Sequence, residues 1–205
     1  MSFSDLTIEG FTEALAARTP VPGGGGASAL VCALGAALGC MVGNYTVGKK
    51  NYAAAEPEVR ELMAEAERIR AEAAALVEAD AEAFEPLSRA YAIPADDPQR
   101  AEIMEQSLRT AAAVPMQILR LSCRMIELHK RLGEIGSTLM ASDVGTGVVF
   151  CWSAMYGAVL NVRVNTKLMA DREYAGALER EADELMQKYW KIADEVYESV
   201  YGRYC

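Results

Sequence analysis

A long stretch without charge constrains this 205-residue chain more than any other feature, because few folds can accommodate it. From position 20 to 48 the sequence reads PVPGGGGASALVCALGAALGCMVGNYTVG, without a single Asp, Glu, Lys, Arg or His. Prolines and glycines forbid helix at its start, and the remainder predicts a helix from about Gly26 to Val47. A helix that is apolar on every side belongs in a protein core or in a bilayer.

The four glycines at the start of this stretch do not form a known nucleotide-binding motif. A Walker loop ends in Lys-Ser or Lys-Thr, and a dinucleotide fingerprint follows a strand, whereas here proline comes first. A closely approached backbone that leads into a helix N-terminus would favour an anion such as a carboxylate. A tight turn that lets two helices cross explains the glycines equally well. On the first interpretation the binding residues are Pro22, Gly23, Gly24 and Gly25.

The uncharged helix is long enough to span a bilayer, and Gly35, Gly39 and Gly43 form a ridge of small residues typical of touching membrane helices. Its Ala/Gly-rich composition and its charged neighbours favour a buried helix in a bundle instead. We therefore expect no membrane span. The ridge would let a neighbouring helix, or the same helix of a second subunit, approach closely, and we expect a homodimer with the binding site near its interface.

The rest of the chain shows helical spacing and no alternating strand pattern, which predicts an all-α fold. We expect one domain over residues 1–205, a compact multi-helix bundle with a buried central Ala/Gly-rich helix and long amphipathic helices. Besides the uncharged helix, we expect a short helix capped by Thr7, with Ile8, Phe11 and Leu15 on one face, and an amphipathic helix over 56–91. A further helix should run from Asp97 and Pro98 to Leu132, with an interruption near Pro115. A second uncharged helix over 144–162 and a charged C-terminal helix complete the prediction.

Composition excludes several classes of function. A formal net charge of −9 argues against nonspecific nucleic-acid binding, which needs a basic surface. The five cysteines are odd in number and form no CxxC pair, and the N-terminus lacks signal-peptide character, so we expect reduced thiols and a cytoplasmic protein. Cys32, Cys40 and Cys151 lie in apolar segments, where a small core residue is favoured over a catalytic thiol.

The single histidine, His129, lies among charges in IELHKRLGE, which favours a solvated helix face over a ligand. One histidine without nearby Cys does not make a zinc site, so we expect no metal and no cofactor. The GxSxG motif of a serine nucleophile is absent as well.

Asp80 stands where a hydrophobic residue is expected. The helix over 56–91 places Val59, Leu62, Ala66, Ile69, Ala73 and Leu76 on one face, and its next positions are Asp80 and Phe84. A desolvated carboxylate has a raised pKa and can exchange a proton near neutral pH. A buried Asp that is satisfied by a structural partner remains an equal alternative at this point.

Three further polar residues lie in or beside the second uncharged helix. Asn161 and Asn165 are four residues apart and share a face, where they can bind a ligand or tie helices together. Asp143 follows Ser142 near the start of that helix, so it can cap the helix or act as a site carboxylate. Capping is the simpler explanation.

Taken in order, several segments of this chain resemble the formiminotransferase-cyclodeaminase C-terminal family, which includes stand-alone methenyltetrahydrofolate cyclohydrolases. They are LAARTPVPGGGGASALVCALGAAL, VGKKNY, DAEAF, SDVGTGVVFCWSAMYGAVLNVRVN and Asp171. The resemblance covers nearly the whole chain, and it is the combination of segments that is specific.

The resemblance implies an all-helical, dimer-forming fold with a folate site in which Asp80 is the acid/base. We expect Asp80 and Asp143 as catalytic residues, with Ser142, Asn161, Asn165 and Asp171 among the substrate contacts. Lys49 and Lys50, just after the uncharged helix, are candidates for binding the anionic glutamate tail of folate, although a solvated helix end explains them nearly as well.

The implied reaction is hydrolysis of 5,10-methenyltetrahydrofolate to 10-formyltetrahydrofolate. The alternatives are cyclodeamination of 5-formiminotetrahydrofolate and a noncatalytic helical module that binds folate. The last is motivated by a departure from the family's Gly-Asn-x-Asn loop, because this chain has Ser137 and Leu139 where the family has asparagines.

Overall fold

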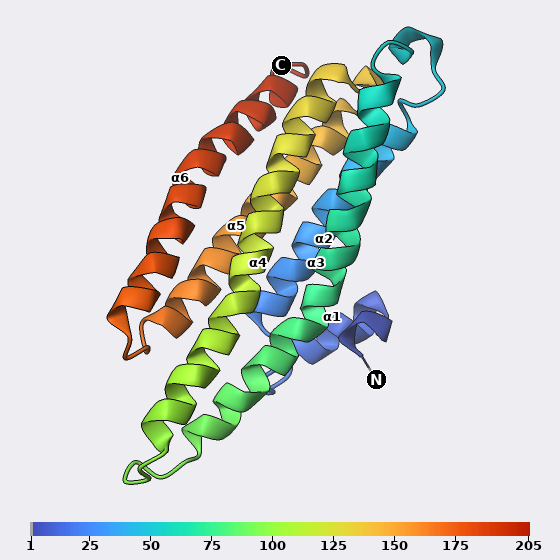
Figure 1. Ribbon diagram of the computed structural model, residues 1–205. Coiled ribbons are helices and arrows are strands. Elements are labelled where there is room, and N and C mark those ends of the chain that lie inside the picture. Colours follow the sequence, from blue (N-terminus) through green and yellow to red (C-terminus); the bar gives the residue numbers. More distant parts are fainter. Residues whose placement is uncertain (1) are drawn as a thin grey trace.

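The computed structural model describes residues 2–205, and over these residues the chain is a bundle of α-helices (Figure 1). The elements are η1 (Phe3–Asp5), α1 (Ile8–Ala16), α2 (Gly24–Asn44), η2 (Lys50–Tyr52), α3 (Glu56–Tyr91), α4 (Arg100–Ile135), η3 (Thr138–Met140), α5 (Ala141–Thr166) and α6 (Arg172–Tyr201), where η denotes a short 3-10 helix. No β-strand occurs in this part of the chain, so the all-α prediction is confirmed.

The helix starts follow from local chemistry. The Thr7 hydroxyl accepts a hydrogen bond from the Gly10 N–H at 3.0 Å and caps α1, as predicted. α3 has the predicted bounds, with Pro57 in its first turn, where a missing N–H costs nothing. Its apolar stripe packs into the core from Val59 to Leu76. Among the α1 stripe residues, Phe11 is buried, while Ile8 is 87% exposed.

Helix α4 corrects one prediction, because it continues through Pro115 without a break. It packs against α2, α3, α5 and α6, and it supplies many of the largest buried side chains, such as Ile118, Met125 and Ile126. Figure 1 shows α4 crossing in front of α2 and α5. Helix α4, more than the Ala/Gly-rich α2, is the shared partner of the bundle.

The glycine ridge of α2 is used inside the subunit. A Cβ at Gly35 would crowd the Cys151 sulfur, one at Gly39 the Met125 methyl, and one at Gly43 the Met63 side chain. These contacts belong to α5, α4 and α3, so the ridge serves neighbouring helices of the same chain. The opposite face of α2 stays exposed, with Leu34 at 47% and Met41 at 39%.

His129 is fully buried, and the prediction of a solvated position was wrong. The side chain of His129 points from α4 into a space that exists because Gly147 of α5 has no side chain. Its Nε2–H donates to the Gly35 carbonyl at 2.9 Å, and its Nδ1 has no partner among residues 2–205. Burial lowers the pKa of His129 to about 4, so the ring is neutral at pH 7.

Two helical segments, 24–44 and 138–166, are long and apolar enough to cross a bilayer. Core helices of globular bundles share this property, and in the most apolar part of each segment 56% and 44% of the residues are buried within the bundle. Some large apolar side chains of these segments are exposed, among them Leu34, Met41, Tyr156 and Leu160, so part of their apolar surface faces outward.

We predict that the buried histidine makes stability depend on pH. An unfolded His binds its proton near pH 6.5 and the folded one only near pH 4, so the unfolded state binds more protons between these values. The free energy of unfolding should therefore fall as the pH drops from 6.5 towards 4, by about 3 kcal/mol in total. Urea unfolding at several pH values measures this loss.

The control is His129→Gln, whose neutral amide can still donate to Gly35. It should unfold with a weaker pH dependence than the parent over this range, because the carboxylates titrate alike in both proteins. Equal slopes would show that His129 has the same pKa in the folded and the unfolded state, against the burial that the structure shows.

Candidate active site

A small cavity lies where the N-terminus of α2 meets α3, α4 and the C-terminal half of α5. It encloses about 170 Å³. Its walls are formed by Pro20, Val21, Gly23, Gly24, Gly25, Asp80, Phe84, Ala111, Pro115, Asn161, Val164 and Asn165. The cavity therefore brings together the glycine loop (residues 23–25), the Asp80 carboxylate and both asparagines, which the sequence analysis proposed as site residues.

Asp80 lies against the first turn of α2. Its Oδ2 accepts a hydrogen bond from the Gly26 N–H at 2.8 Å, one of the N–H groups that a helix start leaves free. This backbone bond and the positive end of the helix dipole are the partners of a half-buried carboxylate. The anion that the glycine loop was predicted to hold is thus, in this structure, the side chain of Asp80.

Gly25 makes this approach possible. A Cβ on Gly25 would overlap the carboxylate of Asp80, and one on Gly24 would lie 3.2 Å from Nδ2 of Asn161. The glycines are needed because other groups occupy the space of their side chains. Pro22, also a predicted contact, is buried beneath the loop: its Cβ lies within contact distance of the position a Cβ would take on Gly26.

Two opposing effects act on Asp80. Burial raises its pKa, and the hydrogen bond from Gly26 lowers it, with burial the larger effect. The net result is a pKa above the usual value for Asp, which brings its protonated and ionised forms closer in population near neutral pH. A carboxyl group of this kind can both take up and release a proton.

Asn161 and Asn165 lie one turn apart on the cavity wall. Asn161 donates through Nδ2 to the Gly157 carbonyl at 2.8 Å. Asn165 donates through Nδ2 to the carbonyls of Asn161, at 2.8 Å, and Ala111, at 3.2 Å. Both amides are tied to helix backbone by their nitrogens, which leaves their oxygens as acceptors for a ligand.

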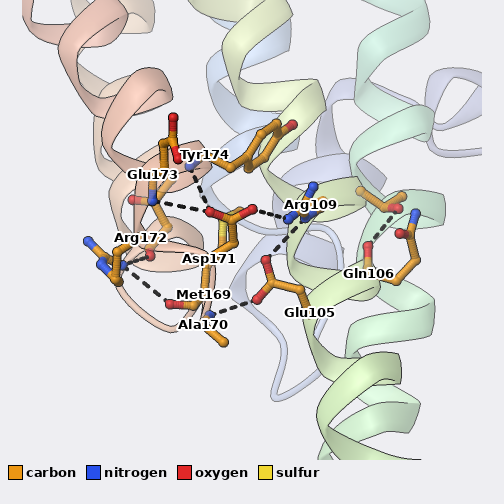
Figure 2. Close-up of polar contacts among 11 residues, drawn as sticks. Glu105, Gln106, Arg109, Met169, Ala170, Asp171, Arg172, Glu173 and Tyr174 are labelled. Atoms are coloured by element: carbon orange, nitrogen blue, oxygen red, sulfur yellow. Dashed lines mark hydrogen bonds and ion pairs between the residues drawn. The ribbon is translucent and has the colours of Figure 1, made fainter.

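Asp171 has a structural role in this structure. It caps α6, accepting hydrogen bonds from the N–H groups of Glu173 and Tyr174, and it pairs with Arg109 at 2.7 Å (Figure 2). The backbone bond from Tyr174, together with Arg109, lowers the pKa of Asp171. An ionised, fully engaged carboxylate is a poor proton shuttle, and Asp171 does not line the cavity.

The other predicted site residues lie at the opposite end of the bundle. Asp143 and Ser142 are in the first turn of α5, so Asp143 is about 27 Å along the helix axis from Asn161. Lys49 and Lys50 follow the C-terminus of α2, whose N-terminus contacts Asp80. Within one chain these four residues do not share a site with Asp80. Asp143 also makes no capping hydrogen bond.

The loop that departs from the family pattern lies at that same far end. The Ser137 N–H donates to the Thr46 hydroxyl at 2.8 Å, and the Thr138 N–H donates to the Tyr52 hydroxyl at 3.0 Å. Ser137 is buried and Leu139 is 78% exposed. The replaced asparagines are therefore distant from the carboxylate of the same chain.

Other reactive chemistry is not assembled in the part of the chain that the structure describes. Burial raises the pKa of Cys32 to about 11 and that of Cys123 to about 12, so these thiols are inert at neutral pH. No three His, Cys, Asp or Glu residues among 2–205 cluster closely enough to hold a metal ion.

A half-buried carboxylate, two oriented amides and a helix N-terminus around one cavity define a small-molecule site in a helical bundle, suited to proton transfer. The chain belongs to the formiminotransferase-cyclodeaminase family, whose pattern matches residues 7–184.

Three relatives illustrate the match. A methenyltetrahydrofolate cyclohydrolase of Methylorubrum extorquens is 34% identical over 95% of both chains. A formimidoyltransferase-cyclodeaminase of Dictyostelium discoideum is 30% identical over 98% of this chain, which spans 37% of that protein. The crystal structure of a formiminotetrahydrofolate cyclodeaminase from Thermotoga maritima superposes with a TM-score of 0.85 at 28% identity, covering 96% of this chain and 98% of that one.

We predict that Gly25→Ala disrupts the site. The new methyl group would overlap the Asp80 carboxylate, so either α2 or Asp80 must move, at a cost of about 1–3 kcal/mol. Thermal unfolding should show the loss. In the matched variant Gly23→Ala the methyl group meets only the Pro20 carbonyl, at 3.8 Å, so stability should stay near that of the parent. Equal stability of the two variants would contradict the close approach.

Proposed function

We propose that this protein is an enzyme of folate one-carbon metabolism that hydrolyses 5,10-methenyltetrahydrofolate to 10-formyltetrahydrofolate. The observation that carries the proposal is Asp80, a carboxylate with a raised pKa at a cavity lined by two fixed amides. The similarity to a stand-alone cyclohydrolase over 95% of both chains supports this choice of reaction.

Hydrolysis needs one group that moves a proton twice. As a carboxylate, Asp80 attracts the cationic methenyl bridge and takes a proton from the water that attacks the bridging carbon. The adduct carries the second water proton on its hydroxyl group. As the carbon–N5 bond breaks, this hydroxyl proton is lost to solvent, which is the net proton released, and Asp80 returns the first proton to N5, which leaves the formyl group on N10. The free oxygens of Asn161 and Asn165 would accept hydrogen bonds from the N–H groups of the pterin ring.

Cyclodeamination of 5-formiminotetrahydrofolate is the second candidate, supported by the structural match to a cyclodeaminase. There N10 attacks the carbon of the protonated formimino group, and ammonia leaves to give the methenyl cation. Asp80 would take the proton from N10 and deliver it to the departing nitrogen, so the same residue serves both reactions. Assaying both substrates with one preparation separates them.

A noncatalytic folate-binding module is the third candidate, supported by Ser137 and Leu139 in place of the family's asparagines. It would bind folate in calorimetry without turnover of either substrate. Measurable turnover would exclude it.

We also propose that two copies of the chain complete the site. The cavity of about 170 Å³ is smaller than the roughly 300–1,000 Å³ that typically encloses such a ligand. Exposed apolar side chains form what we call the α2/α5 face, namely Leu34, Met41, Tyr45, Tyr156, Leu160 and Val164. A shallow groove lined by Ala27, Val31 and Ser153 lies between the two helices.

A second copy packed antiparallel on this face, about a two-fold axis across the helices, would bring opposite ends together. Asp143, Ser142 and the lysines of one subunit would then approach Asp80 of the other, with Lys49 and Lys50 meeting the anionic tail of the substrate. This arrangement accounts for the separation of the predicted site residues in a single chain.

We predict that Asp80→Asn lowers turnover of methenyltetrahydrofolate by about 10²- to 10⁴-fold, because the amide cannot carry the proton. The absorbance of the methenyl form measures the rate. The folded pKa of Asp80 is raised, so its ionisation opposes folding as the pH rises, and the variant should be at least as stable as the parent above neutral pH.

Asp96→Asn, in an exposed loop, is the control and should keep full activity. If Asp80→Asn kept nearly full turnover, Asp80 would be a structural carboxylate, and Asp143 of the second subunit would become the candidate.

We predict that Leu34→Glu separates the subunits. The charge would have to be buried in the α2/α5 face, and its desolvation opposes association. Light scattering without detergent should give twice the chain mass of 22.2 kDa for the parent and the single mass for the variant. Ile103→Glu changes an exposed apolar residue of α4 outside this face and should remain dimeric. A monomeric parent, or one that needs detergent to dissolve, would contradict the proposal.

A further inference from the structure

Pro115 lies in the middle of α4 and removes one hydrogen bond from it. Proline has no N–H, so the carbonyl four residues earlier, on Ala111, has no helical partner. Both residues are buried, and a buried carbonyl without a partner is destabilising. The structure supplies the missing donor from another helix.

That donor is the Asn165 side chain of α5, whose Nδ2 donates to Ala111 at 3.2 Å. The same Nδ2 donates to the Asn161 carbonyl at 2.8 Å, so both of its hydrogens are used. Turning the amide over would set its oxygen against two carbonyl oxygens, so only one orientation is favourable. Oδ1 of Asn165 then remains free to accept from a ligand, and Asn165 lines the same cavity as Asp80.

The other proline inside a helix, Pro86 of α3, shows the contrast. It releases the carbonyl of Glu82, but no side chain among residues 2–205 donates to that oxygen, and Glu82 is exposed to water. Pro86 itself does not line the cavity, although Phe84 does. Of the two prolines inside helices of residues 2–205, only Pro115 therefore releases a carbonyl that accepts a hydrogen bond from a residue of the cavity.

We propose that Pro115 is a positioning residue of the active site. By keeping an N–H out of α4, it reserves the Ala111 carbonyl for Asn165 and so holds the Asn165 oxygen in the orientation that accepts from the substrate. The identity of the substrate rests on the proposed function, whereas the orientation of Asn165 does not.

The test restores the missing N–H. In Pro115→Ala the helix can bond its own carbonyl, which competes with Asn165. Turnover per KM should fall about tenfold, the loss expected for one misaligned hydrogen bond. The melting temperature should not fall, because alanine suits a helix interior better than proline. The control Pro86→Ala should keep parental turnover.

A backbone variant separates the N–H from the proline ring. Lactic acid at position 115, introduced as an ester, has the methyl group of alanine but no N–H. We expect it to retain parental turnover where Pro115→Ala loses it. Loss in both would assign the effect to ring packing and overturn the proposal, as would parental turnover in Pro115→Ala. If Pro115→Ala did not fold, the lactate protein would be tested alone. Parental turnover would then support the proposal, and a loss of turnover would overturn it.

A second readout does not depend on turnover. With ¹⁵N-labelled asparagine, the Asn165 side-chain amide is assigned by its disappearance in Asn165→Ala. Its hydrogens should exchange slowly in the parent and the lactate protein and faster in Pro115→Ala. Unchanged exchange would overturn the proposal, whereas a parent that shows this protection without turning over either folate would refute only the proposed function.

Discussion

The close approach of α2 to the rest of the bundle is the constraint on which this structure depends. Where α2 meets α3, α4 and α5, glycine takes the place of a side chain, and larger groups of the neighbours fill the space. The pattern recurs on α5, where Gly147 makes room for His129. Interiors are packed nearly as densely as crystals, so each missing side chain sets the position of a particular neighbour.

The same close approach creates the chemistry of the site. With no Cβ at Gly25, the first turn of α2 can set a free N–H against Asp80, which holds a half-buried carboxylate at the cavity wall. Burial destabilises the ionised form of Asp80 more than the single hydrogen bond from Gly26 stabilises it, so the pKa of Asp80 is raised. A group left in this condition is suited to exchanging protons, whereas the fully paired Asp171 is suited to ending a helix.

Within residues 2–205, buried backbone carbonyls are paired with side chains of another helix at two places. Nε2–H of His129 reaches the Gly35 carbonyl, and Asn165 reaches the Ala111 carbonyl. In both cases a side chain of one helix satisfies the main chain of another, which fixes the relative position of the two helices. Polar residues in this core thus specify the packing as well as the site.

The sequence by itself determined the helices and the unusual place of Asp80, because both follow from the repeat of 3.6 residues and from local capping by residues such as Thr7. Only the tertiary structure decided that His129 is buried, that α4 runs through Pro115, and that Asp143 lies far from Asp80. Each of these depends on which helices meet and in which direction. Periodicity reports the face of a helix but not the neighbour that covers it, and a carbonyl freed by proline can be satisfied by an amide fifty-four residues away.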